Sequence, residues 1–329
     1  MGRPERAAGG GCQEWERHMS TAPDNIGLHR YAVITAIATF CLIIAGALVT
    51  SNDAGLSVPD WPLSYGKLMP PMVGGIFYAH GHRMIAGGVG LLTIGLVVWL
   101  LRSEPRRWVR HLGVAALAAV VLQGFLGGTT VLLYLPPVIS IAHASLAQFF
   151  FCCAVGLAIV TSPKWRQSEG QGLAESALSD RIPLFHLAAG TAAAVYLQLI
   201  LGAAIRHPIL GLLPHAFFAG VVASVGFVTA FRALKHHADR AELRRPALAL
   251  GVLLFIQMIL GTGSYLAKYA RQDAQPLPFT IVITTAHVAC GALILAAALS
   301  LALWSRRLLG ALGRPAPVLA PVAEESAKC

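Results

Sequence analysis

The sequence predicts an all-α polytopic membrane protein, in which eight transmembrane helices form two pseudo-symmetric four-helix bundles. Three observations lead to this prediction: the composition, the number of long apolar stretches, and a motif that repeats in both halves of the chain. Hydrophobic residues make up 56% of the 329 positions and charged residues only 12%, and the mean hydropathy is +0.66. These values are far from those of a soluble domain, so the chain is expected in a lipid bilayer.

Eight apolar stretches are long enough to span a membrane, since about 30 Å of hydrocarbon takes roughly 20 helical residues to cross. Backbone polar groups in lipid must be hydrogen-bonded within their own segment, so each stretch is predicted to be a helix. The stretches are 31–50, 76–101, 112–133, 138–162, 183–205, 214–231, 246–266 and 279–304.

An internal repeat organises these helices. The third, fifth and seventh stretches carry Gln-x-x-Leu-Gly at 123–127, 198–202 and 257–261, and the first fits weakly, with Gly46 aligned but Leu42 in place of the glutamine. Each motif precedes a loop and a helix with a histidine near its start. The simplest inference is a duplicated four-helix unit. It predicts an N-terminal bundle at 31–162, a linker at 163–182 and a C-terminal bundle at 183–304, between terminal segments 1–30 and 305–329.

Lysine and arginine residues predict the orientation. Of the 25 in the chain, twenty fall on the side of the N-terminus, Arg83 lies within a span, and four fall on the opposite side, namely Lys67, Arg206, Lys268 and Arg271. Positively charged segments favour the cytoplasmic side, so both termini are predicted there, in a bacterial-type inner (plasma) membrane. The formal charge of +10 therefore reflects topology, and no binding to nucleic acid is expected.

Four histidines recur at one depth: His82, His143, His215 and His287. Each lies just inside the outer end of an even-numbered stretch, within roughly 12 Å of the outer boundary at about 1.5 Å per residue. Each bundle thus offers two neutral imidazoles from different helices, and such a pair can take both axial positions of a haem iron. The pattern predicts haem binding.

Other interpretations of these residues stand beside this one. A membrane histidine can instead be a polar group hydrogen-bonded between helices, although four repeat-related histidines favour ligands. Zinc or copper fits less well, because no acidic residue lies in any predicted span and no cysteine lies beside the histidines. Arg83 either anchors a haem propionate, which we favour, or extends to the interface. His80 lies about 200° around the helix from His82, so the two do not ligate one iron from one face.

The first external loop and the start of the second span carry a specific motif. The run from Thr50 to Lys67 reads Thr-Ser-Asn-Asp-Ala-Gly-Leu-Ser-Val-Pro-Asp-Trp-Pro-Leu-Ser-Tyr-Gly-Lys, and it is followed by Pro70-Pro71 and by His80-Gly-His-Arg-Met-Ile-Ala. This segment closely resembles the haem A synthase family, which includes the mitochondrial cytochrome oxidase assembly counterparts. The resemblance covers essentially the whole chain, with eight helices, two related halves and one histidine on each even-numbered helix.

The resemblance implies an enzyme that oxidises a ring methyl group of haem O to a formyl group, giving haem A for cytochrome oxidase assembly. By matching position, His215 and His287 would hold the iron of a haem b cofactor, and His82 and His143 would face the iron of the substrate haem O as catalytic residues. The implied partners are a haem O synthase, the cytochrome oxidase assembly machinery, an unidentified electron donor and the lipid bilayer. A bound haem suits this role because it passes electrons while the protein supplies position and electrostatics.

Two features depart from the family pattern. The family has a glutamate three residues before the second-helix histidine, where this chain has Ala79, and many members have cysteines in the first external loop, where this chain has none. A carboxylate one turn from His82 would serve as a proton donor or acceptor, and Asp53 and Asp60 in the loop are the nearest candidates. The alternative function is therefore a non-catalytic bis-histidine haem-binding membrane protein, either an electron carrier or a haem-handling assembly factor.

Two further expectations concern the loop and a third function class. Trp61 and Tyr65 are expected to cover the N-terminal haem site, because aromatic rings pack well against a porphyrin edge; an interfacial aromatic belt is the other interpretation. A transporter is disfavoured, because the spans show neither charged pathways nor broken helices.

Overall fold

The computed structural model describes residues 25–168, 182–207, 211–269 and 278–309. Every regular element within these ranges is a helix, and eight of the helices are long and apolar enough to cross a membrane. The predicted all-α class and the eight spans are therefore confirmed. The spans are α2 (Ile26–Ser51), α3 (Gly74–Ser103), α4 (Arg107–Leu132), α5 (Pro137–Val160), α7 (Leu184–Ala204), α8 (Leu212–His236), α9 (Ala241–Tyr269) and α10 (Pro278–Leu309).

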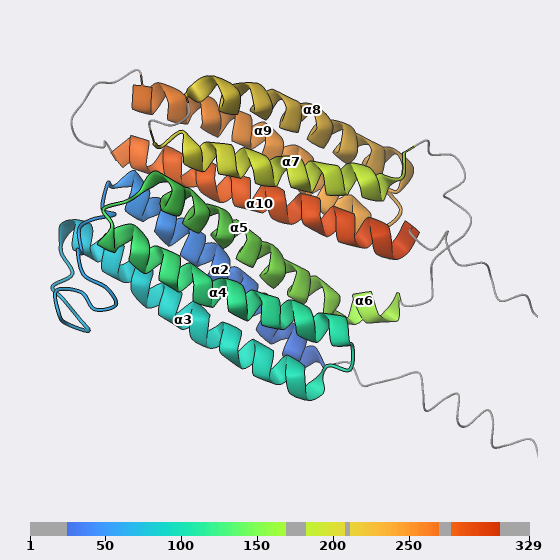
Figure 1. The fold of residues 1–329 in the computed structure, drawn as a ribbon. Coiled ribbons are helices and arrows are strands. Elements are labelled where there is room, and N and C mark those ends of the chain that lie inside the picture. Colours follow the sequence, from blue (N-terminus) through green and yellow to red (C-terminus); the bar gives the residue numbers. More distant parts are fainter. Residues whose placement is uncertain (1–24, 169–181, 208–210, 270–277, 310–329) are drawn as a thin grey trace, which may run out of the picture.

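The eight helices lie in two groups of four (Figure 1). Helices α2, α3, α4 and α5 each contact their neighbours in chain order, and α5 returns to contact α2; α7, α8, α9 and α10 close in the same way. The groups meet along α2 and α5 on one side and α7 and α10 on the other. In α10 half of the most apolar window is buried, against 17–28% in the other spans, so this helix is the most enclosed of the eight.

Several helices extend beyond the predicted spans at the end expected to face the cytoplasm. The helix α4 begins at Arg107 instead of 112, α8 ends at His236 instead of 231, and α10 ends at Leu309 instead of 304. Hydropathy marks the hydrocarbon region alone, whereas helical hydrogen bonds continue into the headgroup region, where arginine and lysine side chains are favourable. Pro246, expected to start a span, lies instead in the second turn of α9, where it removes only one backbone hydrogen bond.

A short helix not predicted from the sequence, α6 (Pro163–Gln167), occupies the start of the linker. Its Arg166 donates to the Glu104 carboxylate after α3 at 2.8 Å, and its Lys164 pairs with Glu242 of α9 at 2.9 Å. Trp165 packs edge to face on Trp304 of α10, with ring centroids 5.2 Å apart. This short helix thus connects both four-helix groups, while the terminal segments 1–24 and 310–329 and most of the linker lie outside the described residues.

Candidate functional site

The four predicted ligand histidines each contact a glycine on the preceding helix. A Cβ atom placed on Gly46, Gly127, Gly202 or Gly261 would lie only 3.2, 3.0, 3.1 or 3.1 Å from the Cε1 atom of His82, His143, His215 or His287, respectively. The same placed atom would lie 3.6 Å from Nδ1 in all four pairs. The histidine positions are therefore structurally equivalent, as a duplicated unit predicts, and the glycines leave the room that the imidazoles occupy.

The sequence pattern explains why these contacts recur. The glycine is the last residue of each repeated motif, and the histidine lies in the first three turns of the following helix, near the end at which the two helices are connected. Antiparallel neighbours bring these two positions to one depth, about 5 to 14 Å from the helix starts at 1.5 Å per residue. The predicted common depth of the four histidines thus follows from chain order and helix geometry together.

The glutamines of the motif have a role that the sequence interpretation missed. Gln123 Nε2 donates to the His143 carbonyl at 2.9 Å, and Gln198 Nε2 donates to the His215 carbonyl at 3.0 Å. Each amide also lies 3.4 Å from the Nε2 atom of the same histidine ring. The glutamine lies four residues before the glycine, so both are on one helix face. This spacing was the signal in the sequence that the glutamine would lie near the same histidine as the glycine.

In the C-terminal group the two imidazoles lie next to one another in a T-shaped arrangement. The ring centroids of His215 and His287 are 6.5 Å apart, with an interplanar angle of 72°. A metal–nitrogen bond is about 2 Å long, and the ring centre lies a further ~1 Å from the nitrogen. Two imidazoles on opposite sides of one metal ion would therefore have centroids roughly 6 Å apart. The Nδ1 atom of His287 is buried and has no hydrogen-bond partner within the described residues. The spacing and the nitrogen donors fit the two axial ligands of a haem iron.

A basic residue that sequence analysis did not assign lies near this pair. Arg206 follows α7, four residues beyond Gly202, and interacts electrostatically with His287 and with Asp53 at the end of α2. The guanidinium adds a positive charge at the end of the C-terminal group where α7 ends and α8 begins, and it is a strong hydrogen-bond donor to carboxylates.

In the N-terminal group, His82 of α3 and His143 of α5 pack on Gly46 and Gly127 in the same way. Both rings are partly buried, and the Nδ1 atom of each is buried without a hydrogen-bond partner in the described part of the chain. These imidazoles, packed on glycines from two other helices, have the donor chemistry of a second axial pair.

Arg83 and His80, which flank this site in sequence, bind the loop between α2 and α3. Arg83 donates to the carbonyls of Val58, Asp60 and Leu63 at 2.7–3.0 Å and to the Ser64 hydroxyl at 3.2 Å. His80 is buried, and its Nδ1 atom lies 2.8 Å from Ser64 Oγ. These bonds hold the loop on α3. The role of Arg83 as a propionate anchor stays a prediction, and in that role Arg83 would have to keep or exchange these bonds.

The loop itself is organised by Asp60 and reaches the N-terminal site through Trp61. The Asp60 carboxylate accepts hydrogen bonds from the backbone N–H groups of Tyr65 and Gly66 at 2.7 and 2.8 Å, and these bonds, that of Gly66 foremost, lower the pKa of Asp60. The Trp61 ring packs on Gly128, where an added Cβ would lie 2.6 Å from it. Gly128 follows Gly127, so Trp61 covers the turn of α4 that supports a histidine.

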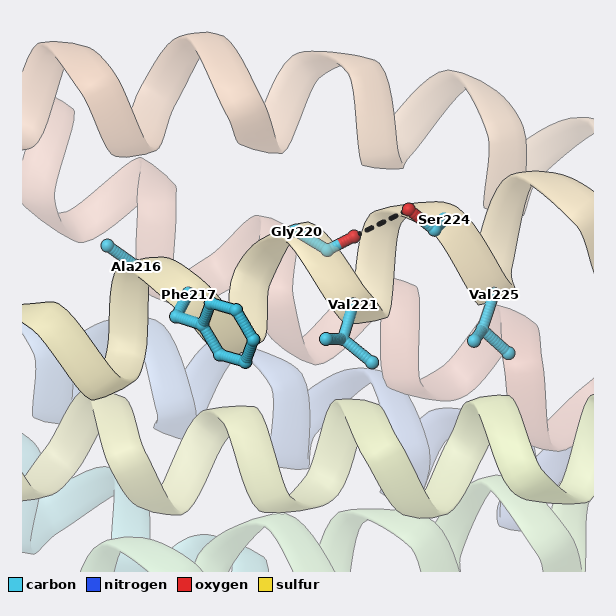
Figure 2. Close-up of a pocket in the computed structure, with 6 residues that line it drawn as sticks. All are labelled: Ala216, Phe217, Gly220, Val221, Ser224 and Val225. Atoms are coloured by element: carbon cyan, nitrogen blue, oxygen red, sulfur yellow. Dashed lines mark hydrogen bonds between the residues drawn. The ribbon is translucent and has the colours of Figure 1, made fainter.

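A groove on α8 lies apart from the histidine sites (Figure 2). Phe217 on its wall is 78% exposed, and the Ser224 hydroxyl donates to the Gly220 carbonyl at 2.8 Å. Both residues are on the face of α8 opposite its buried residues, so the groove faces outward and is separate from the histidine pair. Its lining consists of Ala216, Phe217, Gly220, Val221, Ser224 and Val225.

The glycine contacts allow a direct test of the C-terminal site. Gly202→Ala should displace the His215 ring, because the new Cβ would lie 3.1 Å from Cε1, closer than ordinary contact. We expect roughly a tenfold loss of haem from the C-terminal group, as is typical when the support of a metal ligand is disturbed. Haem content per protein after purification measures the effect.

Gly190→Ala is the matched control for this substitution. Gly190 lies on the same helix, and nothing lies within 4 Å of an added Cβ there. Its haem content should equal that of the unsubstituted protein, and equal haem content in both variants would contradict the role of Gly202.

The chain is thus an all-α membrane protein with two glycine-supported histidines in each four-helix group, and paired imidazoles of this kind fit the axial positions of a haem iron. The family model described as "Cytochrome oxidase assembly protein" matches residues 29–74 and 75–214, which include His82 and His143 and end one residue before His215. The chain belongs to this family, the haem A synthase family of cytochrome oxidase assembly proteins.

Individual relatives extend this result. The chain is 26% identical over 269 residues to a protein of Bacillus pumilus named "Heme A synthase", in a match that covers 74% of this chain and 87% of the relative. It is 25% identical to "Heme A synthase" of Bacillus licheniformis over 56% of this chain and 60% of the relative. For "Heme A synthase" of Symbiobacterium thermophilum the identity is 31%, over 50% and 54%. The last two matches span less than two thirds of those relatives' length.

Proposed function

We propose that this protein is a haem A synthase, which oxidises a ring methyl group of haem O to a formyl group and so supplies haem A for cytochrome oxidase assembly. The observation that carries the proposal is the recurrence of one glycine–histidine contact at four positions, two in each helix group, in a chain of this family. Two separate bis-histidine sites are what an enzyme with one cofactor haem and one substrate haem requires.

The two sites have different roles in this proposal. His215 and His287 hold haem b, which supplies electron transfer when bound. His82 and His143 position the iron of haem O, and Trp61 covers this site from the outer side. The apolar tail of haem O would be accommodated by the lipid-facing helix surfaces, because apolar groups are favourable in lipid.

The surroundings of the protein follow from its charge pattern. Arginine and lysine residues gather at the ends of α3, α8 and α10, which favours a cytoplasmic location for this end of the bundle. We propose a location in a bacterial-type inner membrane with both termini in the cytoplasm. Haem O synthase, the oxidase assembly machinery and an electron donor are the expected partners.

One observation favours the second candidate, a non-catalytic haem-binding protein. Ala79, at the position of the family glutamate, is buried with 6% exposure. The acidic side chains within the described residues are Asp53, Asp60, Glu104, Asp239 and Glu242, and all lie in loops or within the first turn of a helix. A carboxylate that would exchange protons beside His82 is therefore missing from the described helix interiors.

Haem analysis in a host that makes haem O but not haem A tests the two candidates. Expression of the protein should cause haem A to appear in the membranes, as detected by haem extraction and chromatography. His143→Ala is the matched control, because it should retain haem b in the C-terminal site but produce no haem A. If the unsubstituted protein carries haem b and produces no haem A, the non-catalytic candidate is correct.

A further inference from the structure

The four histidine sites differ at one position, one helical turn before the supporting glycine. Gln123, Gln198 and Gln257 occupy this position in α4, α7 and α9, whereas Leu42 occupies it in α2. Leu42 is partly buried and packs against the main hydrophobic core. The motif that ends at Gly46, the glycine on which His82 packs, thus has a leucine where the other three motifs have a glutamine.

The amide restrains the neighbouring histidine in two of the sites. Gln123 and Gln198 donate to the main-chain carbonyls of His143 and His215 at 2.9 and 3.0 Å, and their amides lie within 3.4 Å of a ring nitrogen. Gln257 lies against Gly291, one turn beyond His287 on α10. A hydrogen bond of this kind typically changes an equilibrium constant by about two- to tenfold.

The surroundings of His82 lack such a restraint. The Leu42 side chain has no hydrogen-bond donor, and the residue one turn before His82 is the buried, apolar Ala79. The ring packs on Gly46, and its Nδ1 atom has no hydrogen-bond partner within the described residues. Arg83 holds the backbone of α3 to the loop, so rotation of the His82 side chain is the motion left available.

We propose that His82 is the exchangeable ligand of the substrate haem iron and that His143 is the permanent one. A small neutral diatomic gas binds to the iron on the His82 side, because Leu42, one turn before Gly46, and Ala79, one turn before His82, carry apolar side chains that suit an apolar ligand. This inference rests on the proposed function, because it assigns unequal roles to the two residues that position haem O. In this inference Leu42, at the position where the other motifs have glutamine, leaves His82 free to exchange.

Carbon monoxide is the probe that tests this inference. The protein is purified from a host that makes haem O, reduced, and titrated with carbon monoxide while the optical spectrum is recorded and the haem O content is measured by chromatography. Leu42→Gln should lower carbon monoxide affinity per haem O about two- to tenfold, because the new amide would restrain His82. Ile37→Gln, which adds the same amide on the exposed side of α2, should leave the affinity unchanged.

Three further variants keep the inference open to contradiction if Leu42→Gln does not fold. Gln123→Leu should raise carbon monoxide binding by a similar factor, because it releases His143. His82→Ala should retain haem O and bind carbon monoxide without displacement of a ligand, whereas His143→Ala should lose haem O. Equal affinities in the unsubstituted, Leu42→Gln and Gln123→Leu proteins would overturn the inference. It would also be overturned if His143→Ala retained haem O while His82→Ala lost it. A protein without any bound haem O contradicts the proposed function itself.

Discussion

Replacing His215 or His287 with alanine should remove haem b from the purified protein. Each substitution deletes one of two imidazoles whose centroids are 6.5 Å apart, and with it one axial ligand. Loss of a group that merely supports a metal ligand typically costs 10- to 100-fold in affinity, so loss of the ligand should cost at least about that much. The reduced-minus-oxidised spectrum and the haem b content per protein measure the result.

The two halves provide the control for this experiment. His82→Ala removes the equivalent residue of the N-terminal group, which packs on Gly46 in the same way that His215 packs on Gly202. It should keep the full haem b signal. A haem b spectrum that persists in both His215→Ala and His287→Ala would refute the assignment of these residues as ligands, and a spectrum lost only in His82→Ala would exchange the roles of the two halves.

Replacing Glu104 with alanine should destabilise the protein by about 3–5 kcal/mol, the usual cost of removing one partner from a buried ion pair. The Glu104 side chain is fully buried and lies 2.7 Å from Arg106 Nε and 2.8 Å from Arg166 Nη2. Without it, two largely buried guanidinium groups lose their counter-charge, and the connection between α3 and α6 is lost. Unfolding in detergent, followed by circular dichroism, measures the change.

A more exposed ion pair at the same end of the bundle is the matched control. Glu242→Gln removes the partner of Lys164, whose side chain is 63% exposed, and should cost no more than about 1 kcal/mol. An equal loss in both variants would show that burial of the Glu104 cluster does not matter.

The Glu104 cluster also predicts a dependence of stability on pH. Burial raises the pKa of Glu104, but hydrogen bonds and charge from Arg106, with a contribution from Arg166, outweigh this effect and leave the pKa below 4.5. A carboxyl group with a lowered pKa in the folded state contributes stability above its unfolded pKa, and this contribution is lost as the pH falls through the folded pKa. The difference in stability between the unsubstituted protein and Glu104→Ala should therefore shrink below about pH 4.5.

Much of the fold was predictable because the constraints of a bilayer act on local sequence. An apolar stretch of about 20 residues must be helical in lipid, and all eight stretches are helices. The common depth of His82, His143, His215 and His287 followed from their places near the starts of the even-numbered helices. The Gln-x-x-Leu-Gly motif indicated the repeat, and its glycines proved to be the residues that contact the histidines.

Tertiary structure alone decided how the polar groups of the site are used. Arg83 is one helical position from His82, and the sequence allowed it a propionate or the membrane interface. The fold of the loop between α2 and α3 adds three backbone carbonyls as its partners, and the propionate role stays a prediction. Glu104 and Arg166 are far apart in the chain, and only the position of α6 makes them partners. Hydropathy and spacing depend on residues close in sequence, so they determined the class, the spans and the depth of the histidines. Hydrogen bonds and ion pairs depend on which loops and helix ends meet in space, and only the packing of the whole chain determines those meetings.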